Sequence, residues 1–78
     1  MENLVGRYEK ALNAISESGL LIADAEKMTF DAFIRIQFRF SVQRTKALKT
    51  LGYPYINGRG EVEVMFSYDG ESIIILLV

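Results

Sequence analysis

The clearest pattern in the sequence is FDAFIRIQFRFSVQ, which runs from Phe30 to Gln43. Every even position is apolar, and every odd position except Phe33 is polar. A period of two places these two sets on opposite faces of a β-strand. A helix fits less well, because only five of eight positions along one helical stripe are apolar. We therefore predict a strand over residues 30–43, whose apolar face consists of Phe30, Ala32, Ile34, Ile36, Phe38, Phe40 and Val42.

The composition limits the chain to one small domain and excludes several chemistries. It has 78 residues, half of them apolar, which is enough for one compact core. It contains no cysteine and no histidine, which excludes disulfides, thiolate metal sites and histidine-based catalysis. No apolar run approaches the roughly 18 residues of a membrane span, and the first ten residues lack the apolar core of a signal peptide. These features fit a cytoplasmic protein that does not associate with membranes.

Two helices are predicted around the main strand. Residues 2–18 carry apolar side chains at spacings of three and four, and Gly19 then suits a helix end. The apolar face of this helix consists of Leu4, Val5, Tyr8, Leu12 and Ile15. Residues 44–51 form a second, shorter helix, which Gly52 and Pro54 end, and residues 53–60 form a loop. Residues 20–23 are interpreted as a short strand with a turn at residues 24–27, and a short helix over this segment remains an alternative.

The last 18 residues read as a β-hairpin around Asp69-Gly70. A type I′ turn needs positive φ at both central positions, which this pair tolerates. In the predicted register, Tyr68 faces Glu71, Phe66 faces Ile73, Val64 faces Ile75 and Val62 faces Leu77. The final strand is apolar on both faces, so we expect it in the middle of the sheet.

The expected fold is a single α+β domain over residues 1–78. It has an N-terminal helix, a three- to four-stranded antiparallel or mixed sheet, a short helix between strands and a C-terminal β-hairpin. The main strand and residues 61–68 are expected on either side of the final strand and parallel to each other, with both helices on the Phe/Ile face.

The first candidate surface is a basic one in the middle of the chain. Six cations and no acid lie between Ala32 and Gly60, whereas the flanks hold all ten carboxylates and three cations. The polar face of the main strand, with Gln37, Ser41 and Gln43 among its members, leads into a basic helix. Its cations, with the one in the following loop, are Arg35, Arg39, Arg44, Lys46, Lys49 and Arg59. Such a run suits contacts to the phosphates of a nucleic acid. The alternative is a solvated face whose arginines pair with Glu61 and Glu63 on a neighbouring strand.

The second candidate surface is the loop YPYINGRG at residues 53–60. Tyr53, Tyr55 and Arg59 are residue types enriched at interface hot spots. The alternative is that a tyrosine covers the core edge and Ile56 anchors the loop.

The third candidate surface is the second face of the hairpin, formed by Met65, Ile74, Leu76 and Val78. If both helices cover the other face, this apolar patch has no cover within the chain. Contiguous exposed apolar patches mark interaction sites, and symmetric pairing of two such faces would give a homodimer. The alternative is that residues 20–29 or the first helix fold over it.

Catalytic and metal-binding patterns are absent from the sequence. Asp24, Glu26 and Asp31 lack the spacing of a calcium loop, so we interpret them as solvated turn carboxylates. The serines have no histidine to activate them, and Gly58 and Gly60 lack the context of a phosphate loop. We therefore expect a non-enzymatic protein-interaction module, an adaptor or inhibitor without a cofactor. A nucleic-acid-binding module that uses residues 35–59 is the alternative.

Overall fold

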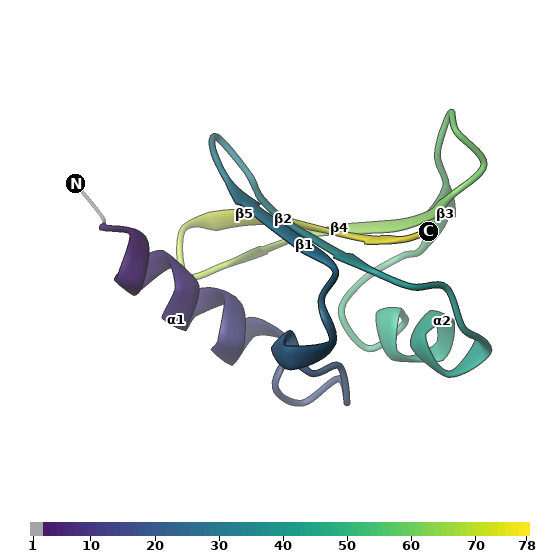
Figure 1. Cartoon of the computed structure of the whole chain (residues 1–78), viewed down its shortest axis with the longest axis horizontal. Coiled ribbons are helices and arrows are strands. Elements are labelled where there is room, and N and C mark those ends of the chain that lie inside the picture. The colour runs from purple at the N-terminus through teal and green to yellow at the C-terminus, as the bar shows by residue number, and fades with distance from the viewer. Residues whose placement is uncertain (1–2) are drawn as a thin grey trace.

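The computed structural model describes residues 3–78 and has an α+β architecture (Figure 1). Two helices and a short 3₁₀ turn combine with a mixed sheet in the order β1-β2-β5-β4-β3. The elements are α1 (Leu4–Ile15), the 3₁₀ turn (Ile22–Asp24), β1 (Lys27–Phe30), β2 (Ile34–Phe38), α2 (Val42–Leu48), β3 (Tyr55–Ile56), β4 (Val62–Tyr68) and β5 (Glu71–Leu77). The predicted class is confirmed, and the sheet has five strands where three or four were expected.

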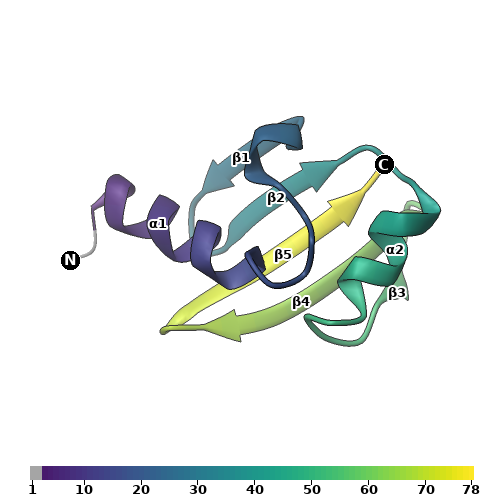
Figure 2. The same ribbon diagram turned by 90° about the horizontal axis from the view of Figure 1, so that it is seen from below.

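Both helices lie on the same face of the sheet, as predicted. Figure 2 views the sheet from that side, with α1 near the start of β5 and α2 near its end. The core fills the space between the layers. Its fully or almost fully buried members are Ala11, Ile15, Leu20, Ile34, Ile36, Phe38, Leu48, Val64, Ile73, Ile75 and Leu77. Neither α1 nor α2 covers the other face of the sheet (Figure 1).

Helix α1 begins at an Asn3 cap, whose side-chain oxygen accepts a hydrogen bond from the Gly6 amide at 2.7 Å. The predicted helix over residues 2–18 is therefore shorter, and its first residue lies outside the described part of the chain. The predicted apolar face is largely wrong, because of its members only Ile15 is buried. Ala11 is the other buried residue of the helix, since a small side chain lets the backbone approach the sheet. The larger apolar residues lie beside this contact and stay partly or largely exposed.

The predicted long strand over residues 30–43 is wrong in its extent. A turn at residues 31–33 separates β1 from β2, and the two strands form an antiparallel hairpin in which Phe30 pairs with Ile34. The Asp31 side chain stabilises the turn by accepting a hydrogen bond from the Phe33 amide at 3.0 Å. At the other end, Ser41 caps α2 by accepting a hydrogen bond from the Arg44 amide at 3.0 Å. As a result, Phe40 and Val42 are exposed and do not extend the apolar face.

The segment between α1 and β1 does not contain the expected strand. Leu20 is buried against the core, and the chain then forms the 3₁₀ turn before it enters β1. Helix α2 starts two residues earlier than predicted and is followed by a turn at residues 49–51. The predicted loop over residues 53–60 contains the short strand β3, which pairs with β4.

The predicted C-terminal hairpin is confirmed in its register. All four expected pairs occur, from Tyr68 with Glu71 to Val62 with Leu77. Asp69 and Gly70 have φ angles of 48° and 79°, as a type I′ turn requires.

Strand β5 lies in the middle of the sheet, as predicted, but the expected direction of its neighbours is wrong. β2 runs parallel to β5 and β4 runs antiparallel to it, so β2 and β4 are antiparallel to each other. A parallel arrangement needs a connection that returns along the whole sheet. The seven residues of α2 extend only about 10 Å, whereas the seven residues of β5 extend about 23 Å. The residues after α2 do not make this return either, because β3 pairs with the first residues of β4. The chain therefore enters β4 at the same end of the sheet at which it leaves β2.

Candidate functional site

The uncovered side of the sheet, which we call the open face, brings residues from all five strands together. In β2, Ile34, Ile36 and Phe38 are buried, so the intervening Arg35 and Gln37 point away from the core. Residues opposite each other in register share a face. One row across the open face is Thr29, Arg35, Ile74 and Met65, and the next is Lys27, Gln37, Leu76, Glu63 and Tyr55.

The centre of the open face is apolar. Of the four residues predicted for a dimer face, Met65 of β4 pairs with Ile74 of β5, and Leu76 follows on the same face of β5. The fourth, Val78, comes directly after the end of β5. Ile74 is only 7% exposed. Met65 is 52% exposed. Neither α1, α2 nor the segment before β1 folds over these residues, because all three lie on the other side of the sheet (Figures 1 and 2).

A group of three cations, which we call the cation cluster, lies beside this apolar strip. It consists of Lys27 from β1, Arg35 from β2 and Arg59 from the turn between β3 and β4. They line a hollow of about 260 Å³ together with Thr29, Gln37 and Leu76. Among residues 3–78, no carboxylate lines this hollow.

The turn that carries Arg59 is organised by Asn57. The Asn57 side-chain oxygen accepts hydrogen bonds from the amides of Arg59 and Glu61 at 2.9 and 3.0 Å. Gly60 adopts a positive φ of 79°, which lets the chain reverse into β4. This local structure holds the turn in place and presents the Arg59 side chain to the hollow.

The two glutamates expected to neutralise the arginines bind elsewhere. β5 lies between β2 and β4, so Glu63 is not a neighbour of Arg35. Its carboxylate instead accepts hydrogen bonds from the Tyr55 hydroxyl and the Asn57 amide. The hydrogen bond to Glu63, with smaller contributions from desolvation and from the charge of Glu63, raises the pKa of the Tyr55 phenol above its ordinary value of 10.0.

Three carboxylates predicted to be solvated turn residues form ion pairs with arginines. Carboxylates from residues 24–31 approach basic side chains that follow them in the chain. The pairs are Asp24 with Arg44 at 3.6 Å, Glu26 with Arg39 at 3.9 Å and Asp31 with Arg35 at 3.9 Å. These acids are therefore not merely solvated turn residues. The pairs at 3.9 Å are long and exposed, so they offset the positive charge only weakly.

The eight predicted partner-binding residues do not form one surface. Arg35, Tyr55 and Arg59 belong to the open face, and Arg39 follows β2 with its side chain 80% exposed. The others accompany α2 on the opposite side of the sheet. They are Arg44, Lys46, Lys49 and Tyr53. The sequence missed Lys27, whose only signal was its place before an apolar stretch.

Arg44 acts as a structural residue. Its guanidinium lies over the Phe38 ring at 5.6 Å from the centroid and donates a hydrogen bond to the Arg39 carbonyl. Together with its ion pair to Asp24, these contacts leave it little freedom to bind a partner. Tyr53, by contrast, is 93% exposed beside Pro54 and does not cover the core edge.

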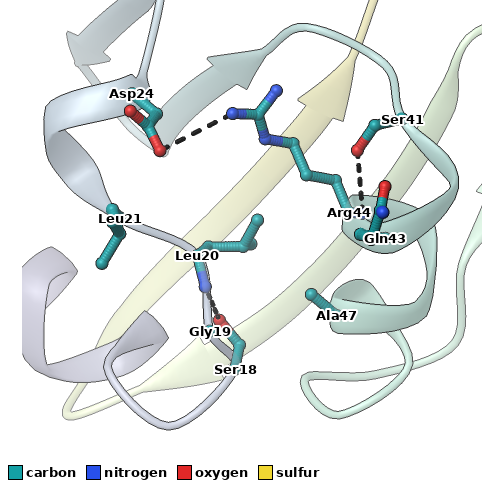
Figure 3. Close-up of a pocket in the computed structure, with 9 residues that line it drawn as sticks. All are labelled: Ser18, Gly19, Leu20, Leu21, Asp24, Ser41, Gln43, Arg44 and Ala47. Atoms are coloured by element: carbon teal, nitrogen blue, oxygen red, sulfur yellow. Dashed lines mark hydrogen bonds and ion pairs between the residues drawn. The ribbon is translucent and has the colours of Figure 1, made fainter.

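A larger hollow of about 560 Å³ lies between the segment after α1 and the start of α2 (Figure 3). Most of its polar side chains already have partners within the chain. The Ser18 hydroxyl accepts a hydrogen bond from the Leu20 amide, Ser41 caps α2, and Arg44 pairs with Asp24. This hollow therefore presents fewer unsatisfied groups to a ligand than the open face does.

A second exposed apolar patch, which sequence reasoning placed in the core, lies on α1. Leu4, Val5 and Tyr8 remain exposed and meet Phe30 of β1 around a shallow hollow without polar lining. Its residues are apolar only, so it offers no charge that would select a partner.

Two kinds of structural feature are absent from residues 3–78. No group of three acidic, cysteine or histidine side chains is arranged to hold a metal ion. Over the same residues, neither helix has the length and apolar character needed to cross a membrane.

Comparison with known proteins gives no relative: no protein-family model matches the chain, and neither the curated proteins nor the solved structures contain a similar protein.

Proposed function

We propose that this chain is a non-enzymatic protein-interaction module, an adaptor or inhibitor, that docks a partner on its open face. The observation that carries this proposal is the apolar strip along the central strand, which no helix or strand within residues 3–78 covers. The protein leaves Met65 52% exposed beside Ile74, which is buried, while Leu76 is partly exposed and Val78 is 39% exposed. An uncovered apolar patch is typical of interaction surfaces. The proposal includes the cytoplasmic location expected from the lack of cysteine.

The partner that suits this face is an acidic protein. Lys27 and Arg59 have no carboxylate within 4 Å among residues 3–78, and Arg35 has only a long pair with Asp31. Cations at the edge of an apolar strip steer an acidic surface towards it and then orient it, because complementary charge raises association rates and selects partners. The apolar strip supplies contact area at the centre of such an interface.

A comparison of three immobilised proteins tests this proposal: the wild type, Met65→Lys and Ile56→Lys. Ile56 is a matched control, because it is an exposed apolar residue that alternates with Tyr55 and so points away from the open face. We expect an acidic protein from a cell extract to bind the wild type and the Ile56→Lys variant, to be lost from Met65→Lys, and to be released by salt.

The same set of retained proteins on all three surfaces would contradict the proposal. The mass in solution, measured by light scattering, separates a further outcome. A mass near twice 8.9 kDa that Met65→Lys halves would make the partner a second copy of the chain. That result would keep the docking surface and overturn the acidic partner.

Nucleic-acid binding is the second candidate, favoured by the failure of Glu61 and Glu63 to pair with Arg35. Three cations on one face are fewer than the six first considered, because the cations around α2 lie on the other side. We therefore expect any binding of random-sequence DNA or RNA to weaken with salt at a log–log slope of roughly −2 to −3, as about three phosphate contacts require. Fluorescence anisotropy at several salt concentrations measures this slope, and no binding at low salt excludes this candidate.

A further inference from the structure

We infer that the cation cluster binds a single phosphate group. Its three members come from separate parts of the chain: Lys27 from β1, Arg35 from β2 and Arg59 from the turn before β4. The fold therefore brings together three positive charges that the sequence keeps apart. The hollow can bind phosphate whether or not a protein docks on the open face.

Lys27 and Arg59 have no carboxylate within 4 Å among residues 3–78, and Arg35 has only its long pair with Asp31. A sphere of 260 Å³ is about 8 Å across, which is no more than the Debye length of roughly 8–10 Å in physiological salt. The three cations therefore repel one another with little screening. Leu76 contributes an apolar wall, which reduces the screening further. A bound anion would replace this repulsion by attraction.

The other polar groups of the hollow are also suited to an oxyanion. Thr29 Oγ1 is buried and has no hydrogen-bond partner among residues 3–78. Buried hydroxyl groups normally have one. This oxygen exposes less than 1 Å² of surface, so a phosphate oxygen reaches it only if neighbouring side chains shift. Gln37 adds an amide, and two arginines offer planar forks that match phosphate oxygens.

Phosphate fits this set better than a carboxylate does. A phosphate monoester carries a charge of about −1.5 to −2 and three acceptor oxygens, against one charge and two oxygens for a carboxylate. The charge and the number of acceptor oxygens of a phosphate therefore match three cations and the Gln37 amide better than those of a carboxylate do. The hollow also leaves room for part of the molecule to which the phosphate is attached.

Titration with inorganic phosphate, followed by ¹H–¹⁵N NMR at constant ionic strength, tests this inference. We expect saturable shifts confined to β1, β2 and residues 57–60. Lys27→Ala and Arg59→Ala should each weaken binding about tenfold or more, as expected for one charged hydrogen bond. Lys49→Ala, which removes an exposed cation next to α2, is the matched control and should leave the affinity unchanged.

Thermal unfolding gives a second readout whose sign depends on the anion. The wild type should gain roughly 5–10 °C in Tm when phosphate is present at ten times its Kd. In chloride alone, Arg59→Ala should raise Tm, because it relieves repulsion, and it should abolish most of the gain from phosphate. If Arg59→Ala lowers Tm by the same amount in chloride and in phosphate, the inference is overturned.

Further ligands identify the source of the phosphate. Adenosine monophosphate and O-phosphoserine are compared with inorganic phosphate and with acetate. Tighter binding of either ester than of inorganic phosphate assigns the site to that class, provided that Arg59→Ala weakens it. Acetate binding as tightly as phosphate, or no saturable shift with any of the four, would overturn the inference.

Separate variants test the proposed function and the phosphate site, so either can be refuted without the other. Met65 does not line the hollow, so Met65→Lys should abolish docking of the partner and retain the phosphate-dependent rise in Tm. Arg59→Ala should abolish most of the phosphate-dependent rise in Tm, and it leaves the side chains of the apolar strip unchanged.

Discussion

The assignment of an open face makes a sharp prediction at two consecutive residues of β4. Val64 is fully buried against Ile75, whereas Met65 is 52% exposed and pairs with Ile74 on the other side of the sheet. Lysine substitutions at these two positions place the same charge on opposite faces of one strand. Their effects on stability should therefore differ strongly.

The expected cost at Val64 approaches the whole stability of the domain. Val64→Lys loses about 1.5–3 kcal/mol of apolar burial and places an unpaired ammonium in the core, at a further cost of several kcal/mol. A chain of 78 residues at roughly 0.05–0.15 kcal/mol per residue has a free energy of unfolding of about 4–12 kcal/mol. We expect this variant to be largely unfolded.

The expected cost at Met65 is small. About half of the side chain is exposed, so at most about 1 kcal/mol of burial is lost. The lysine stem covers part of the same surface while its ammonium remains in water. Met65→Lys should therefore lose less than about 1 kcal/mol, or roughly 4–8 °C in Tm at most.

Urea unfolding followed by far-ultraviolet circular dichroism measures both variants. A loss of more than about 2 kcal/mol for Met65→Lys, unchanged with protein concentration, would refute the reasoning, because it would mean that another part of the same chain covers the face. A loss that grows on dilution would instead indicate that a second molecule covers it.

Three further predictions concern contacts that hold the layers and turns. Tyr55→Phe should lower Tm at neutral pH and match the wild type in strong alkali. The pKa of the Tyr55 phenol is raised in the folded state, chiefly by its hydrogen bond to Glu63. This hydrogen bond therefore stabilises the fold below pH 10, and the stabilisation is lost as pH rises through the raised pKa. Measurement of Tm for both proteins from pH 7 to 12 tests this prediction. Arg7 donates hydrogen bonds from Nε and Nη2 to the Glu71 carboxylate at 3.0–3.2 Å, and both side chains are mostly buried. A double-mutant cycle with alanine at both positions should therefore give a coupling energy of about 1–2 kcal/mol. Additive losses of stability in the two single variants would contradict this prediction. Gly70→Ala forces a side chain into a φ of 79° and should cost about 1–2 kcal/mol in urea unfolding, whereas no loss would mean that the turn rearranges.

The C-terminal hairpin could be predicted because its information is local. Asp69 and Gly70 adopt conformations that few residues accept, and a two-residue turn leaves one register for the flanking strands. The apolar pattern of residues 71–77 on both faces also indicated a central strand. Each of these signals acts between residues that are close in sequence.

The extent predicted for the main strand, residues 30–43, is wrong for a geometric reason. In the β1–β2 hairpin, Phe30 pairs with Ile34 and Met28 with Ile36. Even-numbered residues therefore point to the core whether the chain continues straight or reverses through residues 31–33. An alternation of apolar residues cannot distinguish these two paths, and only Asp31 indicated the turn. Ser41, a good helix cap, was the corresponding signal at the other end.

The candidate site was predictable only in part. The sequence identified Arg35, Arg59 and the apolar residues of the open face. The sequence could not show that Lys27 and Arg59 line the same hollow. Lys27 lies on one edge strand of the sheet, and Arg59 follows the other edge strand. Their proximity therefore depends on the arrangement of all five strands. For the same reason the sequence combined cations from both sides of the sheet into one surface. Patterns within a strand show which face a residue occupies but not which distant residue lies next to it.

The central position of β5 has a consequence for how the protein acquires its structure. β2 and β4 have no direct contact with each other in the sheet and are joined through a strand that follows both in the chain. While the polypeptide is being made, the β1–β2 hairpin leaves the ribosome about 30 residues before β5, and during that interval the edge of β2 that later pairs with β5 is unpaired. Exposed strand edges recruit other chains, and pairing between distant segments slows folding. We therefore expect the stretch from Ile34 to Phe38 to be the part of the nascent chain most prone to aggregation, and the closure of β5 against it to be the step that limits the folding rate.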